Sequence, residues 1–165
     1  MISWKTRSAE ERALLSPSFC STLLWEAAAA YSLDVGVSLP FEISFLVLPM
    51  VLHRETRESL PHAVSTSLAV WLEKYPLARS HVGERARTLM PFTKDAIIFG
   101  GTHGLLDLSQ GAISARGDWR KAINTELSDS TAEVRTCARR AEFVGRWLAR
   151  TGSPGTVMAL LGVKP

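Results

Sequence analysis

Residues 91–116 read PFTKDAIIFGGTHGLLDLSQGAISAR, the pattern of a capped helix that runs into a small β-hairpin. Thr93 is a favourable N-cap for the apolar stretch that follows it, and Gly104 suits the left-handed residue that often ends a helix. Beyond Gly104, apolar residues alternate with period two on both sides of the turn SQG at 109–111, as in a hairpin with one buried face. We therefore expect a helix that begins after Thr93, followed by a two-stranded wing.

Two further helices are expected just before this stretch, over residues 66–75 and 77–89. Apolar residues recur at helical spacing in both, and Pro76 separates them. With the helix after Thr93 and the hairpin, they make three helices and a wing, which is the order of a winged helix-turn-helix. The predicted fold is thus mainly α with a small β-hairpin, a winged-helix-like module flanked by N- and C-terminal helices.

The residues before this module predict a pair of helices. A helix over 17–32 follows from a serine N-cap, a proline at the first helical position and an alanine-rich run. Pro40 opens the second, FEISFLVLPMVLHRET, which is apolar nearly all round and therefore belongs in the centre of the domain. Pro49 should kink this helix near Phe45, unless the helix ends there.

The clearest amphipathic helix of the chain is expected over residues 131–150. Its apolar residues recur every three or four positions, and four arginines lie within about 60° of one another on the opposite side, taking 100° per residue. The segment 117–129 before it is a linker or a short helix. Residues 156–163 form a short apolar tail that can dock on the core.

The length and composition fit one domain. The chain has 165 residues, and 46% of them are hydrophobic, which is enough for a single core. We divide it into an N-terminal extension (1–16), the helical pair (17–61), the winged-helix-like module (62–117), and a linker with the C-terminal amphipathic helix and tail (118–165). All four parts are expected to pack as one compact unit.

The cysteines and the apolar runs predict a cytoplasmic protein. Cys20 and Cys137 are far apart, form no CxxC pair and follow no signal peptide, which indicates a reducing compartment. The longest apolar run, residues 39–52, falls short of the roughly 20 apolar residues needed to cross a bilayer. We expect no contact with a membrane.

No constellation of residues indicates catalysis. The four histidines show no zinc-site spacing, and none lies beside a cysteine. The glycine-rich GGTHG at 100–104 lacks the Lys-Ser/Thr pair of a phosphate-binding loop and follows a helix, so close helix packing explains Gly100 and Gly101 better. We expect no catalytic residue, no metal and no cofactor, and we interpret the chain as not an enzyme.

A winged helix raises the question of DNA binding. The net charge of +3 and isoelectric point near 9.1 are only mildly basic, and the expected recognition helix offers little beyond Lys94, Thr102 and His103 for base contacts. The basic residues lie elsewhere, and they form either an ordinary solvated face or a surface for a DNA backbone or an acidic partner. These candidate binding residues are Arg79, Arg85, Arg87, Arg135, Arg139, Arg146 and Arg150.

Four segments carry a family resemblance: SPSFCSTLLWEAAAAY, LPFEISFLVLPMVLHRETRESLP, TSLAVWLEKYP and RARTLMPFTKDAIIFGGTHGLL. They fall within residues 16–116 and resemble the middle component of bacterial three-component ABC-ATPase (ABC-3C) systems, the group that includes Lamassu-type defence systems. We expect the resemblance to continue to the end of the chain. Its most distinctive elements, LPFE, LVLP, HRETRESLP and PFT, contain no catalytic motif, so it transfers no active-site residue.

The resemblance implies a small non-enzymatic subunit encoded beside an SMC/Rad50-like ABC ATPase and an effector, often a nuclease, that acts against phage or plasmid DNA. This subunit would hold the ATPase heads and the effector together as a kleisin-type bridge, and a contact with the DNA backbone is compatible with that role. The alternative hypothesis is a winged-helix DNA-binding transcriptional regulator, which would be a dimer with a basic recognition helix. A third is an enzyme subunit whose site the sequence does not reveal.

Overall fold

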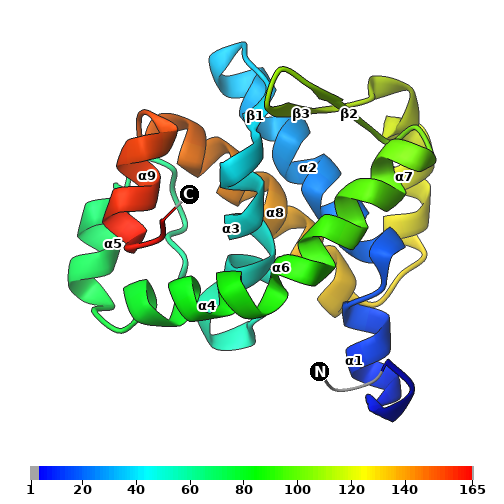
Figure 1. Ribbon diagram of the computed structural model, residues 1–165, viewed down its shortest axis with the longest axis horizontal. Helices are drawn as coiled ribbons and strands as arrows, with labels where there is room; N and C mark the ends of the chain where they lie inside the picture. Colours follow the sequence, from blue (N-terminus) through cyan, green and yellow to red (C-terminus); the bar gives the residue numbers. More distant parts are fainter. Residues whose placement is uncertain (1–3, 165) are drawn as a thin grey trace.

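The protein is a mainly helical chain with one small antiparallel sheet, as the computed structural model of residues 4–164 shows (Figure 1). This confirms the predicted fold class, mainly α with a small β-hairpin. The α-helices are α1 (Ala9–Leu14), α2 (Pro17–Val35), α3 (Phe41–Val51), α4 (Arg54–Ser59), α5 (Leu68–Lys74), α6 (Ala78–Thr102), α7 (Arg120–Ser128), α8 (Ala132–Arg150) and α9 (Pro154–Leu161). The 3₁₀ helices are η1 (Trp4–Thr6) and η2 (Gly117–Trp119), and the strands are β1 (Leu39–Pro40), β2 (Leu106–Ser109) and β3 (Ala112–Ala115).

The helix α2 begins as the sequence predicts and lies in the centre of the protein. Ser16 accepts a hydrogen bond from the N–H of Phe19 at 3.3 Å, and Pro17 takes the first helical position. Gly36, with φ of 73°, ends the helix three residues beyond the predicted boundary. Residues 23–25 are fully buried in succession, because α3, α6 and α8 all pack against α2. A helix covered on all sides cannot show an amphipathic pattern.

The single helix predicted from Pro40 is two helices, α3 and α4. The first is buried on nearly all sides, as expected, and it continues past Pro49 to Val51. The chain then turns, and α4 starts afresh because the Nδ1 of His53 accepts a hydrogen bond from the N–H of Thr56 at 3.3 Å. The sequence did not reveal this break, since histidine is not among the usual N-cap residues.

The two helices predicted over 77–89 and after Thr93 are one helix, α6. Thr93 is fully buried within it and its Oγ1 donates to the carbonyl of Leu89 at 3.2 Å, so the predicted N-cap is wrong. Pro91 lies inside α6, and the ribbon bends partway along its length (Figure 1). The buried residues on both sides of Pro91, such as Val82 and Ile97, offset the cost of an interior proline, about 3 kcal/mol. The winged helix is not confirmed, because its helix-turn-helix needs a break at Thr93.

The predicted hairpin and the helix end before it are confirmed. Gly104 has a φ of 71°, and the N–H of Leu105 donates to the carbonyl of Gly100 at 2.8 Å, which closes the end of α6. Strands β2 and β3 pair antiparallel through a two-residue turn, Gln110-Gly111, with φ values of 52° and 72°. The close packing predicted for Gly100 is also found, because a Cβ there would lie 2.5 Å from the Oγ of Ser21; Gly101 has more room.

A third strand, β1, completes the sheet in the order β1-β3-β2. Leu39 pairs with Ile113, and the N–H of Phe41 donates to the carbonyl of Gly111 at 2.9 Å. Both Leu39 and Ile113 are fully buried. Leu108, expected on the buried face, is 50% exposed. A strand of two residues is too short to leave a period-two pattern, so the sequence does not reveal it, and Pro40 is predicted to open the helix that follows.

The C-terminal elements match their predictions. The segment after the hairpin contains a short helix, α7, and Thr131 caps α8 by accepting a hydrogen bond from the N–H of Val134 at 3.3 Å. The apolar tail forms α9, whose Val157, Met158 and Leu161 are buried. Residue 165 of the tail and residues 1–3 of the predicted extension lie outside the described residues. The proposed boundaries of the four parts of the chain stay a prediction.

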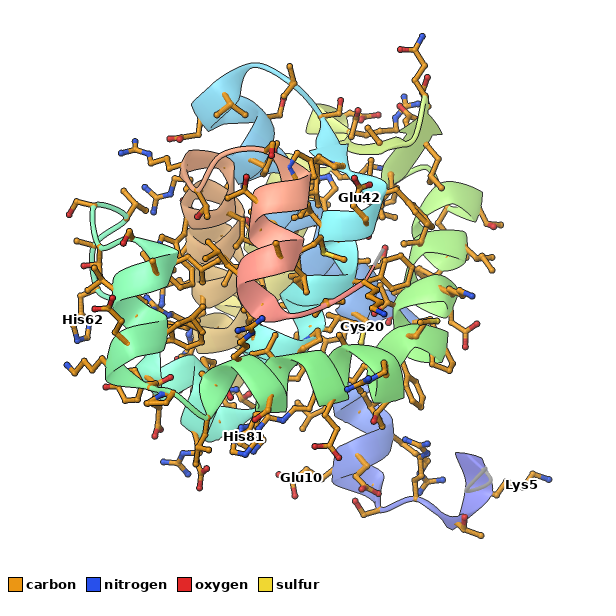
Figure 2. All side chains as sticks on the ribbon, turned by 60° about the vertical axis from the view of Figure 1, so that its left-hand side comes forward. Lys5, Glu10, Cys20, Glu42, His62 and His81 are labelled. Carbon is orange, nitrogen blue, oxygen red and sulfur yellow. The ribbon has the colours of Figure 1, made fainter. Side chains whose placement is uncertain are left out.

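The N-terminal end of the described chain stands away from the body of the protein. Figure 2 shows η1 and α1, which carry Lys5 and Glu10, below the packed helices. No residue of α1 is buried, and the guanidinium of Arg7 lies 4.6 Å from the ring centre of Phe92 on α6. Across residues 4–164, we find no helix with both the length and the apolar character needed to span a bilayer.

Candidate partner-binding surface

The four predicted arginines of α8 lie along one helix but differ in how available they are. Arg139 is exposed and donates to the Oγ1 of Thr136 on its own helix at 3.3 Å. Arg135 turns back toward the loop before α8, where it donates to the carbonyls of Ser128 and Ser130. Arg139 can therefore contact a partner without giving up a tertiary contact, whereas Arg135 cannot.

Arg150 and Arg146, nearer the end of α8, have acidic neighbours. The Nε and Nη2 of Arg150 donate to the two carboxylate oxygens of Asp34 at 2.8 and 3.0 Å. This bidentate pair joins the ends of α8 and α2, and it holds the pKa of Asp34 below its usual range. Arg146 lies 3.7 Å from Glu142 on the same helix. Arg150 thus has a structural partner within the chain.

The three predicted arginines of α6 contact different elements. Arg79 donates to the carbonyl of Ala159 in α9 at 3.4 Å, and Arg85 donates to the Oγ1 of Thr56 in α4 at 2.7 Å. Burial lowers the pKa of Arg85, while Arg87 is exposed. Arg79 and Arg87 line a groove of about 630 Å³ between α6 and the end of α9. Arg79 and Arg85 thus contact α9 and α4. On α8, Arg135 and Arg150 contact the preceding loop and α2.

A second groove, of about 310 Å³, lies where α2, α7 and α8 meet, and Arg135 and Arg139 line it. On α2, the side chain of Glu26 is only 7% exposed, and its carboxylate lies 3.4 Å from Arg120. Burial raises the pKa of Glu26, and the charge of Arg120 opposes that shift only in part. The guanidinium of Arg120 also stacks over Trp25, 4.2 Å from the ring centre. The groove thus contains one buried carboxylate, that of Glu26, beside exposed arginines such as Arg120 and Arg139.

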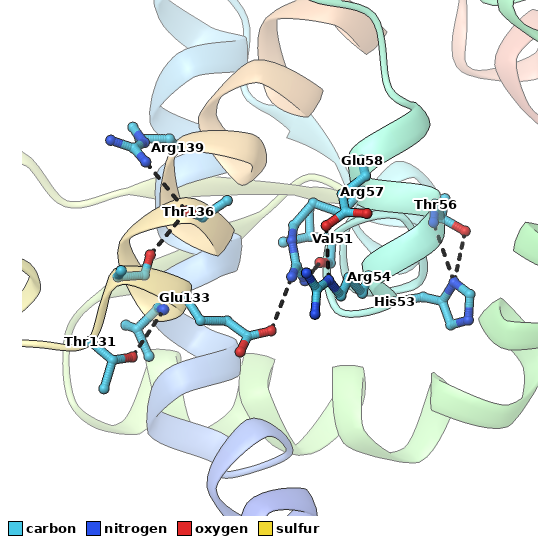
Figure 3. Close-up of polar contacts among 12 residues, drawn as sticks. Val51, His53, Arg54, Thr56, Arg57, Glu58, Thr131, Glu133, Thr136 and Arg139 are labelled. Atoms are coloured by element: carbon cyan, nitrogen blue, oxygen red, sulfur yellow. Dashed lines mark hydrogen bonds and ion pairs between the residues drawn. The ribbon is translucent and has the colours of Figure 1, made fainter.

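The sequence missed a third polar site, at the junction of α4 and α8 (Figure 3). There, Arg57 is 6% exposed; its Nη1 donates to the carbonyl of Val51 at 2.8 Å and its Nη2 to the carboxylate of Glu133 at 3.0 Å. These contacts tie the end of α3 and the start of α8 to α4. The pocket beside them has a volume of about 470 Å³, and Arg54, Glu58 and Arg140 also line it.

One signal in the sequence could have indicated this junction. Arg57 falls in HRETRESLP, one of the most distinctive elements of the family resemblance, which carries no catalytic motif. An arginine two positions after Glu55 on a short polar helix looks like a solvated residue. Its burial depends on α8, which is 76 residues away in sequence, so local spacing does not predict it.

The cysteines and histidines do not form a site. Cys20 and Cys137 are both buried and free, and burial raises the pKa of Cys20 to about 12. Within residues 4–164, no group of three or more His, Cys, Asp or Glu side chains could hold a metal ion. His103 caps its own helix, with Nδ1 2.9 Å from the carbonyl of Phe99. The candidate site of this protein is thus its charged surface.

These observations define a small, mainly helical protein with grooves and charged pockets on its surface. The chain belongs to the family of ABC-three component (ABC-3C) system Middle Component 3, whose model matches residues 4–165. The match covers nearly the entire chain, so it confirms the resemblance seen in four segments and its expected continuation to the C-terminus. Comparison with curated proteins and with solved structures finds no match.

Proposed function

We propose that this middle component is a non-enzymatic adaptor, which bridges an SMC/Rad50-like ABC ATPase and an effector in a cytoplasmic complex that acts against phage or plasmid DNA. The observation that carries the proposal is membership of the middle-component family along almost the whole chain. A middle component works within a system that has other components, among them an ABC ATPase. Bridging requires surfaces that bind the partners, and it does not require catalytic residues.

The arrangement of the arginines supports a bridge. Arg139 on α8 is exposed, and Arg79 and Arg87 on α6 line a different groove, bounded by α9. A bridging subunit needs two surfaces, one for each partner, and exposed arginines are common anchors in protein interfaces. We assign the α8 surface to one partner and the α6–α9 groove to the other.

The alternative of a DNA-binding regulator has lost its main support. It relied on a recognition helix that begins after Thr93, but Thr93 is buried inside α6. Lys94 is the single basic residue between Thr93 and Thr102. A base-reading helix normally projects several Arg, Lys, Asn or Gln side chains into the major groove.

Co-purification of the tagged protein with the products of its neighbouring genes, with and without ATP and DNA, tests the proposal. We expect a large ATPase and an effector in a fixed ratio, and at least tenfold less of one of them with the double variant Arg139→Glu/Arg146→Glu. The matched control is Lys74→Glu/Lys94→Glu, which changes the charge equally at two exposed lysines outside the candidate set. Recovery of a lone dimer that shifts a specific DNA fragment would contradict the bridge, and equal recovery with both double variants would remove the α8 surface from it.

A further inference from the structure

The buried guanidinium of Arg57 is only partly used by the protein itself. Its Nη1 and Nη2 are hydrogen-bonded, but its Nε, which is buried, has no hydrogen-bond partner among residues 4–164. The Nε and Nη2 of an arginine form the edge that binds the two oxygens of a carboxylate as a fork. Glu133 occupies one of these two positions, through a single oxygen at 3.0 Å.

Glu133 is far more exposed to solvent than Arg57, the residue that it contacts. Its side chain is 52% exposed, whereas that of Arg57 is 6% exposed. Figure 3 shows Glu133 reaching from the first turn of α8 across to the guanidinium of Arg57. An exposed glutamate can rotate into solvent, and a carboxylate that takes its place keeps the buried guanidinium paired, so the exchange leaves no unpaired buried charge. Rotation would open the fork to the pocket.

The charges around the pocket suit one more carboxylate. Three guanidinium groups line it, from Arg54, Arg57 and Arg140, against two carboxylates, from Glu58 and Glu133. Arg140 is fixed in place, because it donates to the carbonyl of Pro61 at 2.7 Å and stacks over Phe143. One excess positive charge matches a singly charged group, while the two carboxylates would repel a phosphate of higher charge.

We propose that this pocket is a docking site for an acidic side chain of a partner protein, whose carboxylate takes the Nε–Nη2 fork of Arg57 when Glu133 rotates out. Without the partner, Glu133 occupies part of the same position on Arg57, and it therefore competes with the partner's carboxylate. This inference rests on the proposed function, because an adaptor must present such a site to another subunit. Arg57 would link partner binding to the contact between α4 and α8, because the same guanidinium binds the partner's carboxylate and Glu133 of α8.

The test is a titration of the isolated protein, followed through the Nε–H resonance of Arg57 by NMR. The probe is N-acetyl-glutamate amide, and its glutamine analogue, inorganic phosphate and a short DNA duplex are the comparisons. We expect a saturable shift with the glutamate probe, and binding about fivefold tighter to Glu133→Ala because the competing carboxylate is gone. Glu58→Ala is the matched control: it removes a carboxylate of the same pocket that pairs with Arg54, and it should leave the affinity unchanged.

Several results would overturn the proposal. A shift of equal size with the glutamine analogue, or no saturable shift with Glu133→Ala, would show that the fork takes no carboxylate. A stronger response to phosphate or to the duplex would assign the site to a phosphate ligand instead. Because the titration uses no partner protein, its failure would leave the bridging role intact, and failure of the co-purification would leave this site intact.

Discussion

Gly145 of α8 lies directly against the backbone of Ala27 in α2. A Cβ at position 145 would stand 2.2 Å from the carbonyl oxygen of Ala27 and 2.9 Å from its Cα, distances that real side chains do not reach. This close approach lies where α2 and α8 pack along each other. The packing of α2 against α8 thus requires glycine at position 145.

Replacement of this glycine should damage the packing of α2 on α8. The obstacle is backbone and cannot rotate away, so we expect Gly145→Ala to lower the free energy of unfolding by about 3 kcal/mol. Chemical denaturation followed by circular dichroism measures this loss. Gly155→Ala in α9 is the control, because a Cβ there would meet only the Oγ of Ser153 at 3.9 Å, and its stability should match or slightly exceed that of the wild type.

Two adjacent isoleucines of α6 give a second test of the core. Ile97 is 4% exposed and Ile98 is 65% exposed. Ile97→Asp buries an unpaired carboxylate and should cost about 4 kcal/mol or more, whereas Ile98→Asp should change stability by less than about 0.5 kcal/mol. Thermal unfolding of both variants makes the comparison. Equal melting temperatures would mean that the face of α6 turned to the core is wrongly assigned.

Much of the fold could be predicted from the sequence because its signals are local. The caps at Ser16 and Thr131 and the glycine end at Gly104 depend on residues within one helical turn, and all three are present in the structure. Thr93 has the same local signal, but here tertiary packing decides the outcome. Its side chain is fully buried and bonds to the turn behind it, so the helix continues through a proline two residues earlier.

The candidate site was less predictable than the fold. Exposed arginines such as Arg139 follow from the polar side of an amphipathic helix. The partner of Arg150 does not, because Asp34 lies 116 residues away, and neither does the burial of Arg57. A charge pattern in a sequence shows which side of a helix is polar. It does not show which charges the protein uses internally, and that distinction decides which remain for a partner.

Glu26 should make the stability of the protein depend on pH. Burial raises the pKa of this carboxyl in the folded state above its ordinary value of 4.5, so the folded state holds the proton more tightly than the unfolded state. Stability must then fall as pH rises from about 4.5 through the raised pKa. We expect Glu26→Gln to melt at a higher temperature than the wild type at pH 7, with a gain that shrinks toward pH 4.5.

Thermal unfolding at a series of pH values between 4.5 and 7.5 measures this effect. Glu126→Gln is the control, because it removes an exposed carboxylate of the neighbouring helix α7. A gain for Glu26→Gln that is constant with pH would show that the burial of this carboxylate costs nothing. In that case, the pair with Arg120 would compensate its desolvation fully.

His53 should act in the opposite direction, through the cap of α4. Its Nδ1 accepts the N–H of Thr56 at 3.3 Å and lies 3.1 Å from the Thr56 hydroxyl, which also accepts from Arg85. The ring must be neutral at Nδ1 to accept, and burial, aided by the charge of Arg85, lowers the pKa of His53. The folded state therefore resists protonation, so this stability is complete above about pH 6.5 and is lost as pH falls through the lowered pKa.

His53→Asn separates the cap from the titration. Asparagine is a strong N-cap that does not ionise, so this variant should keep its stability near pH 7 and lose less of it than the wild type at pH 5. His53→Ala should lose about 1 kcal/mol already at pH 7, because the cap itself is gone. His62→Asn changes an exposed histidine of the following loop and should follow the wild-type profile. Identical slopes for His53→Asn and the wild type would show that α4, and with it the position of Arg57, does not depend on a neutral histidine.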